Sequence, residues 1–171
     1  MKTIEIQLYK FDELSEAAQE TAIFNQSDIN VDYDWWDSVY EDAKNVGLVI
    51  DGFVLDYGKI NATFENGGED TARAIIAEHG KECDTYKLAE QYLSAKAEIL
   101  TNMEDIIDDE NSYSYELEGD MEQLSDDFLV DLKGEYLSIL QKEFEYLTSK
   151  EQIIETIKSN DYDFTEDGDI Y

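Results

Sequence analysis

The strongest pattern in the chain is a run of apolar residues with a helical period between 119 and 147. These residues recur at steps of three and four, the spacing of one face of an α-helix. They are Met121, Leu124, Phe128, Leu132, Tyr136, Ile139, Leu140, Phe144 and Leu147. Gly119-Asp120 predicts the start of the helix, Thr148-Ser149 predicts its end, and carboxylates crowd its expected outer face. At about 1.5 Å per residue it would be about 40 Å long, so we predict a long central helix at about 120–147.

Shorter patterns before this helix predict a mixture of strands and helices. Residues 3–11 alternate between apolar and polar, which is typical of a half-buried strand. Two helices and the two strands of a hairpin around Gly58 are expected next, at 12–25, 32–46, 48–57 and 59–65, with Asp12 or Ser15 as the N-cap of the first helix. The order of the elements begins as strand, helix, helix, hairpin.

The remaining segments are mainly helical. Helices are expected at 69–79, 84–107 and 149–159, an exposed acidic loop at 108–118, and a small strand–turn–strand at 163–171. The whole order indicates an α+β fold, mainly helical, with a small antiparallel sheet. With 171 residues, no proline and no clear linker, we expect one domain spanning 1–171.

Composition adds an unusual charge to this picture. Hydrophobic residues make up 42% of the chain and aromatic residues 12%, which is enough to build a core and excludes a disordered acidic tail. Yet 43 acids stand against 12 bases, a net charge of −31. Such a polyanion repels nucleic acid and anionic membranes and attracts cations or basic proteins. Because self-repulsion costs stability, we expect the charge to serve a function.

Cysteine content and hydropathy indicate where the protein acts. Cys83 is the single cysteine, which excludes an internal disulfide and fits a reducing compartment. No apolar run approaches the roughly 20 residues of a membrane span. We therefore expect a soluble protein in the cytoplasm of a host cell, with no membrane contact.

The charge is concentrated in particular stretches. No Lys or Arg occurs from 97 to 132, whereas 58–100 is close to balanced. The base-free tract carries the carboxylates that we expect to contact a partner: Glu104, Asp105, Asp108, Asp109, Glu110, Glu116, Glu118, Asp120, Glu122, Asp126, Asp127 and Asp131. A second edge of the same surface is expected at Asp28, Asp32, Asp34, Trp35 and Asp37. A surface that is acidic only for solubility or salt tolerance would be even along the chain, so the unevenness favours a binding face.

Trp35 and Trp36 are adjacent and cannot both point inward. One of them is expected either to be partly exposed beside the acids or to pack under the hairpin. Exposed aromatic residues among charges are typical of interface hot spots. Trp35 is therefore included in the predicted contact surface, with filling of the core by both rings as the alternative.

The charge is large enough to imitate DNA. Duplex DNA carries about 0.6 negative charges per Å of axis. A compact domain of this length would be about 40 Å long, so the net charge corresponds to about 0.8 charges per Å. The sequence therefore predicts a charge density that matches or exceeds that of DNA.

Catalytic and metal sites find little support in the sequence. His79 is the only histidine and precedes Gly80 at a predicted helix end, which favours a structural role. The acids from 28 to 34 have the alternation of a calcium loop, but Tyr33 stands at its sixth position, where glycine is needed. Asp42-Ala43-Lys44, with Asp32 or Asp34 upstream, matches the short pattern of a metal-dependent nuclease, although a strong negative charge opposes DNA binding. We expect neither an enzyme nor a required cofactor or metal.

Three segments carry a resemblance to known proteins. They are Tyr9–Ile23, Asp28–Trp36 and Tyr162–Gly168, and through them the whole chain resembles small uncharacterised proteins of phages and other mobile elements. The resemblance brings no catalytic motif. What it implies is context, because strongly acidic phage proteins include DNA-mimic inhibitors of restriction enzymes and CRISPR effectors.

These observations favour a non-enzymatic DNA mimic that binds the nucleic-acid-binding surface of a host defence protein. Its partner would be a basic protein of the host and not nucleic acid itself. The alternatives are an antitoxin-like acidic module that neutralises a basic toxin, and a nuclease that uses Asp42 and Lys44. Self-association into a homodimer also stays open.

Overall fold

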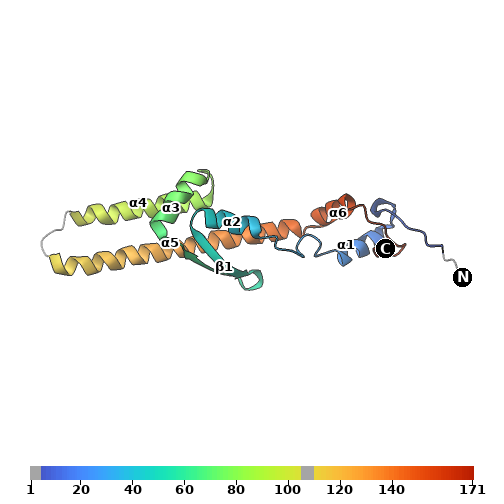
Figure 1. Cartoon of the computed structure of the whole chain (residues 1–171), viewed down its shortest axis with the longest axis horizontal. Helices are drawn as coiled ribbons and strands as arrows, with labels where there is room; N and C mark the ends of the chain where they lie inside the picture. The colour runs from blue at the N-terminus through green and yellow to red at the C-terminus, as the bar shows by residue number, and fades with distance from the viewer. Residues whose placement is uncertain (1–4, 105–109) are drawn as a thin grey trace. The chain divides into compact units, whose positions relative to one another are not determined.

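The computed structural model describes residues 5–104 and 110–171, with side chains described outside 103–116. The fold is α+β and mainly helical, with one two-stranded sheet in the described part, as expected (Figure 1). The chain divides into two compact units, each with its own hydrophobic cluster. We call Trp36–Gln141 the central unit, and the residues up to Trp35 together with Lys142–Tyr171 the terminal unit. The expectation of one domain stays a prediction, which a single cooperative unfolding transition would support.

The central unit begins with a helix and a β-hairpin. Its elements are α2 (Asp37–Asn45), β1 (Leu48–Val54), the 3-10 turn η2 (Leu55–Tyr57) and β2 (Lys59–Phe64). The strands pair antiparallel from Leu48 opposite Phe64 to Val54 opposite Lys59, with an irregularity between Ile50 and Gly52. The turn needs a left-handed residue, and Gly58 supplies it with φ of 58°. The predicted hairpin is confirmed.

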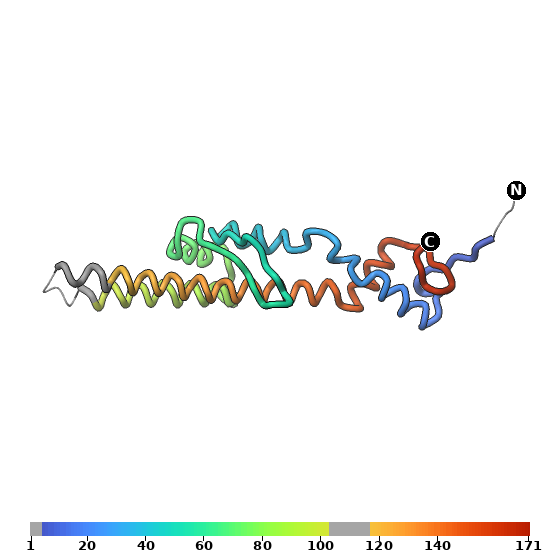
Figure 2. The backbone as a smooth tube through the Cα atoms, turned by 90° about the horizontal axis from the view of Figure 1, so that it is seen from below, coloured from blue at the N-terminus to red at the C-terminus, as the bar shows by residue number. Residues whose placement is uncertain are grey.

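Three further helices complete the central unit. They are α3 (Gly68–Glu78), α4 (Asp84–Glu104) and most of α5 (Glu110–Leu147). In two views α4 and the first part of α5 run side by side (Figures 1 and 2). Tyr92 on α4 stacks on Phe128 of α5 with ring centroids 4.5 Å apart, and Phe64 of β2 stacks on the same ring at 5.7 Å. Aromatic stacking thus joins the hairpin and both long helices in one core.

The apolar stripe on α5 is the one that the sequence predicts. Phe128, Leu132, Tyr136 and Leu140 are buried, and the remaining members of the stripe are partly buried except Phe144, which is at the exposed limit. The periodicity therefore identifies correctly the face of the helix that packs.

The start of α5 differs from the prediction. Gly119 and Asp120 lie inside the helix, which begins at Glu110, so the expected acidic loop at 108–118 is helical from 110 onward. A glycine inside a helix costs only about 1 kcal/mol. Acids in the first turn of a helix interact favourably with the helix dipole, which favours a helix start at Glu110. Residues 108 and 109 of the expected loop, and 105–107 of the helix expected before it, lie outside the described part.

The terminal unit has a separate core. It contains the 3-10 turn η1 (Phe11–Glu13), α1 (Glu16–Asn25), the end of α5 and α6 (Lys150–Ser159). Its buried cluster consists of Phe11, Leu14, Ala18, Ala22, Ile153, Ile157 and Phe164. Both short helices begin at serine N-caps, because Ser15 accepts a hydrogen bond from the Ala18 amide and Ser149 accepts one from the Gln152 amide. These two caps confirm the predicted helix starts.

The predicted strand at 3–11 is wrong for the residues that the structure describes. Residues 5–8 have no strand structure, and the side chain of Ile6 is 53% exposed although its alternation predicts burial. Only Tyr9 pairs, through two backbone hydrogen bonds of 2.9 Å with Phe164. An alternating segment forms a strand only where a second strand pairs with it through a series of backbone hydrogen bonds. Here the pairing is limited to the single bridge between Tyr9 and Phe164. The expected strand–turn–strand at the C-terminus is likewise reduced to isolated bridges, including Phe164 with Ile170.

The helix expected at 32–46 begins later, at Asp37. The backbone before it forms tight turns, in which the Trp35 amide donates to the Tyr33 carbonyl at 2.7 Å. In a helix, two successive residues project only about 100° apart. The turns instead let the rings of Trp35 and Trp36 pack on different partners. Gly47 follows the helix with φ of 81°, as expected of a residue after a helix end.

Candidate functional site

Acids of the base-free tract form two rows along α5. The first row is Glu118, Glu122 and Asp126, and the second row is Asp120, Asp127 and Asp131, all of them exposed. Residues four or seven positions apart lie on one side of a helix, so each row follows one flank of the buried stripe. Between the rows the outer surface carries Gly119, Gln123 and Val130. The expected carboxylate-crowded outer face is thus corrected to two rows beside a neutral strip.

The rest of the predicted tract is described in less detail. Glu104 ends α4, and Glu110 and Glu116 lie in the first turns of α5, so these three are placed by their helices. Asp105, Asp108 and Asp109 lie outside the described residues. The two rows are therefore the part of the predicted face whose side-chain exposure is described.

The long helix lowers the charge density expected from the sequence. Its 38 residues span about 57 Å at 1.5 Å each, which exceeds the 40 Å assumed for the whole chain. The net charge of −31 spread over this length is at most about 0.5 charges per Å. The two rows alone place six carboxylates on about 20 Å of helix, or about 0.3 per Å, against about 0.6 for duplex DNA. The charge density of the chain therefore stays below that of duplex DNA, and that of the two rows is about half of it.

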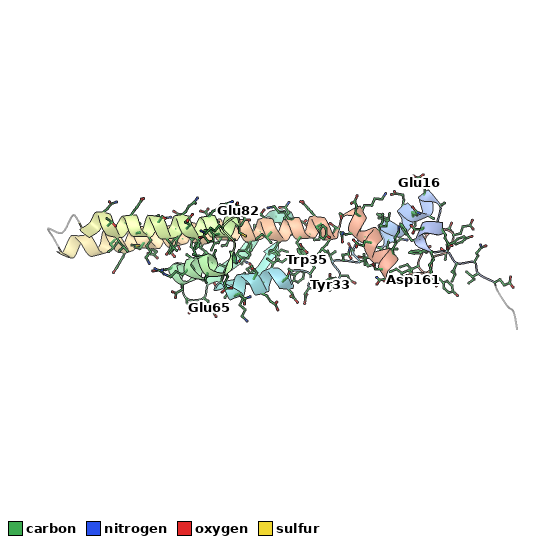
Figure 3. The ribbon with its side chains drawn as sticks, turned by 90° about the horizontal axis from the view of Figure 1, so that it is seen from above. Glu16, Tyr33, Trp35, Glu65, Glu82 and Asp161 are labelled. Atoms are coloured by element: carbon green, nitrogen blue, oxygen red, sulfur yellow. The ribbon has the colours of Figure 1, made fainter. Side chains whose placement is uncertain are left out.

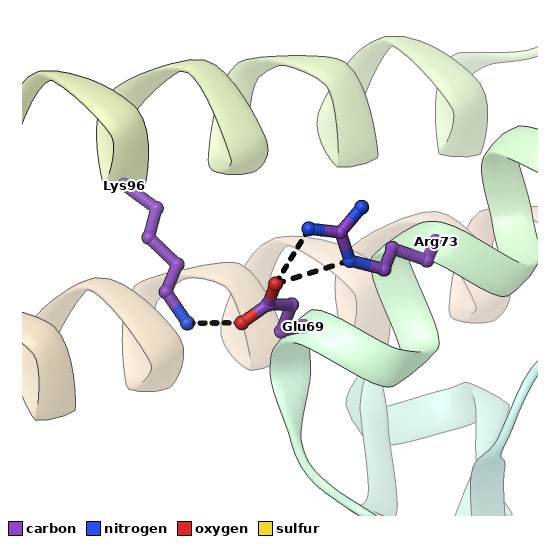
Figure 4. Close-up of polar contacts among 3 residues, drawn as sticks. All are labelled: Glu69, Arg73 and Lys96. Atoms are coloured by element: carbon purple, nitrogen blue, oxygen red, sulfur yellow. Dashed lines mark hydrogen bonds and ion pairs between the residues drawn. The ribbon is translucent and has the colours of Figure 1, made fainter.

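Several bases of the central unit are held by nearby acids. Glu69 on α3 accepts hydrogen bonds from Arg73 and from Lys96 of α4 (Figure 4). These contacts, first of all the bond from Lys96, lower the pKa of Glu69 below its usual value. Lys87 likewise pairs with Asp84 at 2.7 Å. Lys96 is the last base before the base-free tract. Its charge is paired with Glu69 and not with an acid of the tract.

The predicted second edge is divided between the two units. Asp28, Asp32 and Asp34 are exposed in the turns of the terminal unit, whereas Asp37 is exposed in the first turn of α2 in the central unit. The expected edge from Asp28 to Asp42 therefore stays a prediction, because its residues belong to two units.

Trp35 does not offer an exposed aromatic contact. Its side chain is only 8% exposed and packs against Phe144, with ring centroids 5.6 Å apart. Trp36 is half-buried and meets Phe53 of the hairpin edge-on at 5.6 Å, which is the hairpin packing considered for one of the pair. The exposed aromatic residue of this segment is Tyr33, at 60% (Figure 3). The prediction that Trp35 contacts a partner is corrected, because its ring is buried against Phe144 and is not accessible to a partner.

A feature that sequence reasoning missed is a cleft of about 490 Å³ in the central unit. Five acids line it, namely Asp42, Glu78, Glu82, Asp84 and Glu135. They come from α2, from the end of α3 and the turn that leads into α4, and from α5; Glu82 of that turn is labelled in Figure 3. We call this feature the acidic cleft. No local spacing signals it, because its walls are distant in sequence.

His79 lies in the wall of the acidic cleft with only 10% of its side chain exposed. Its Nδ1 atom is 2.7 Å from the Thr85 hydroxyl oxygen. Its Nε2 atom is buried without a hydrogen-bond partner, although Asp42 Oδ1 lies 3.5 Å away, within range of a charge interaction. A distance of 3.5 Å is too long for a strong hydrogen bond between the two atoms.

Asp42 is oriented from its other side. Tyr136 on α5 donates a hydrogen bond to Asp42 Oδ2 at 2.8 Å. Burial, followed by the nearby Asp42 charge, raises the pKa of Tyr136 far above its usual value, so the phenol stays protonated. The arrangement runs from Tyr136 through Asp42 to His79 and Thr85, and it leaves Asp42 Oδ1 and His79 Nε2 facing each other.

The structure places the two residues of the nuclease alternative on different sides of α2. Asp42 faces the acidic cleft, whereas Lys44 lines a different hollow with Tyr40 and Glu41. In a helix, residues two apart point to nearly opposite sides. The nuclease alternative stays a prediction. Among the described side chains, 5–102 and 117–171, no group of three or more His, Cys, Asp or Glu is arranged to hold a metal ion.

Comparison with protein-family models, with curated proteins and with solved structures finds no match to this chain. The resemblance to phage proteins therefore stays a prediction. In the part of the chain that the structure describes, no helix combines the length and apolarity needed to cross a membrane.

Proposed function

We propose that this protein is a non-enzymatic acidic inhibitor that occupies the nucleic-acid-binding surface of a basic host defence protein. Carboxylates would lie where DNA phosphates otherwise bind. The observation that carries the proposal is the pair of exposed carboxylate rows on α5, in a tract without Lys or Arg. A restriction enzyme or a CRISPR effector has the chemistry required of the partner, because both bind DNA through basic surfaces.

The strength of such binding would come from many small terms. A single exposed ion pair contributes about 0–1 kcal/mol, so one Asp→Asn change should have almost no effect. Several charges lost together should weaken binding strongly. Binding should also weaken as the Debye length falls from about 10 Å at 0.1 M salt to about 3 Å at 1 M. Affinity that is constant over this range would indicate an apolar interface instead.

The test uses two variants with equal charge change. The row variant combines Glu122→Gln, Asp126→Asn, Asp127→Asn and Asp131→Asn. The control variant combines Asp51→Asn, Asp56→Asn, Glu65→Gln and Asp167→Asn, which are exposed positions that do not belong to the rows. Both are compared with the parent for inhibition of DNA cleavage by a panel of restriction enzymes and CRISPR effectors.

The proposal expects inhibition by the parent and the control variant, competition by duplex DNA, and loss of inhibition in the row variant. Equal inhibition by all three proteins would reject the rows as the binding face. Tight binding to a basic protein that duplex DNA does not displace would support the antitoxin alternative instead.

A further inference from the structure

The acidic cleft is a second anionic feature of the central unit, formed by other residues than the two rows. We propose that it binds one alkylguanidinium or alkylammonium group, as carried by an arginine or lysine side chain or by a small polyamine. If the protein acts on a basic partner, the cleft would hold an anchor side chain of that partner. Only this last step rests on the proposed function, because the binding chemistry follows from the cleft itself.

Charge and shape select the class of ligand. The lining contains five carboxylates and neither Lys nor Arg, so the cleft attracts cations and repels anions. Ile139 and Gly80 add apolar and backbone surface against which an alkyl stem can pack. The volume of about 490 Å³ lies within the range of small-ligand sites, about 300–1,000 Å³. A side-chain-sized organic cation therefore suits both the charge and the space.

The second observation is the unpartnered nitrogen of His79. Its Nε2 atom is buried without a hydrogen-bond partner, which is unfavourable for a polar atom, and a ligand that donates an N–H would supply the missing bond. The proposal takes the tautomer in which the Nδ1 proton is directed to Thr85, so that Nε2 is an acceptor beside Asp42 Oδ1. Two acceptors 3.5 Å apart then share one wall of the cleft. An organic cation with several N–H donors can donate to both, whereas an anion can donate to neither.

The remaining contacts keep this pair of acceptors in place. Tyr136 holds Asp42 through Oδ2 and so leaves Oδ1 for the ligand. The Asp42 side chain is itself 51% exposed, so a ligand can reach its Oδ1 from solvent while Oδ2 stays bound to Tyr136. Asp42 and His79 are thus the specific contacts, and the other acids supply the surrounding negative potential.

His79 provides a direct probe because it is the only histidine in the chain. Its imidazole C–H signals in a ¹H–¹³C spectrum are followed during titration with Nα-acetyl-arginine amide at constant ionic strength. The neutral control ligand is Nα-acetyl-citrulline amide, which has nearly the same shape. Spermidine forms a third arm that distinguishes a free polyamine from a peptide side chain as the source of the cation.

The proposal expects saturable shifts of the His79 signals with the arginine ligand or with spermidine, and none with the citrulline ligand. Asp42→Asn, which keeps an acceptor for Tyr136, should weaken binding at least about tenfold, because it removes the charged acceptor that contacts the ligand. Glu135→Gln, which removes only part of the surrounding negative potential, should weaken binding less. The row variant should bind the cation as the parent does. Shifts that stay linear, or that NaCl or the citrulline ligand reproduces, would overturn the proposal.

This experiment is independent of the test of inhibition. Loss of cation binding in the Asp42 variant with unchanged inhibition would leave the proposed function in place and remove the anchor role. Loss of inhibition in the row variant with unchanged cation binding would show that the rows are needed for inhibition and not for binding of the cation.

Discussion

The phenolic oxygen of Tyr136 on α5 donates a hydrogen bond to Asp42 Oδ2 on α2 over 2.8 Å. The two residues are 94 positions apart in the chain, and Tyr136 is fully buried. The contact ties the long helix to the first helix of the central unit through a charged acceptor. It also supports one wall of the acidic cleft, so stability and the proposed cation site share this contact.

Removing the hydroxyl should cost less than removing the ring. A hydrogen bond to a charged group contributes about 1.5–3 kcal/mol, and solvent around the half-exposed Asp42 reduces this, so we expect Tyr136→Phe to lower the free energy of unfolding by about 1 kcal/mol. Tyr136→Ala also leaves a cavity and should cost about 3–5 kcal/mol. Urea denaturation monitored by circular dichroism measures both. Equal losses for the two variants would show that the hydrogen bond, and not packing, dominates.

The same tyrosine should destabilise the protein at high pH. The pKa of Tyr136 is raised in the folded protein, chiefly by burial, so its contribution is complete below about pH 10, the usual tyrosine pKa. Above that pH the unfolded chain loses the proton while the folded protein keeps it, and stability falls as pH rises. Tyr136→Phe should therefore show a shallower decline above pH 10 than the parent. Tyr57→Phe is the matched control, because Tyr57 is 78% exposed and its replacement should leave the slope unchanged.

Glu69 should have the opposite effect on the acid side. Its pKa is lowered by Lys96 and then by Arg73, so its contribution is present above about pH 4.5 and is lost as pH falls through the lowered value. Stability of the parent should decline more steeply below pH 4.5 than that of Glu69→Gln. Asp70→Asn, an exposed change at the next position, serves as the control. Parallel acid curves for the parent and Glu69→Gln would show that the ion pairs in Figure 4 contribute nothing to stability.

Two glycines test the course of α5 and its packing. Gly119 lies inside the helix with no atom near an added Cβ, so Gly119→Ala should raise the free energy of unfolding by about 0.5–1 kcal/mol. Gly134→Ala is a second such position on the same helix. At Gly68 a Cβ would lie 2.9 Å from Ser125 Oγ and 3.1 Å from the Tyr92 hydroxyl, so Gly68→Ala should destabilise by about 1–3 kcal/mol. Thermal unfolding of the three variants gives the order, and a destabilised Gly119→Ala would contradict a continuous helix there.

Features that depend on local chemistry could be predicted from the sequence alone. The apolar stripe of α5 follows the helical period, the hairpin follows from two apolar runs around Gly58, and Ser15 and Ser149 cap the helices that follow them. In each of these, the deciding interaction joins residues only a few positions apart. The concentration of acids in the base-free tract is likewise a property of the sequence.

The tertiary structure decided whatever depends on distant partners. The segment before Tyr9 alternates like a strand but finds only one bridge, and Gly119 stays helical because a single glycine costs less than ending the helix. Which tryptophan is buried depends on Phe144, more than 100 residues away. The acidic cleft brings together α2, the turn between α3 and α4, and α5, so only long-range packing could place His79 beside Asp42.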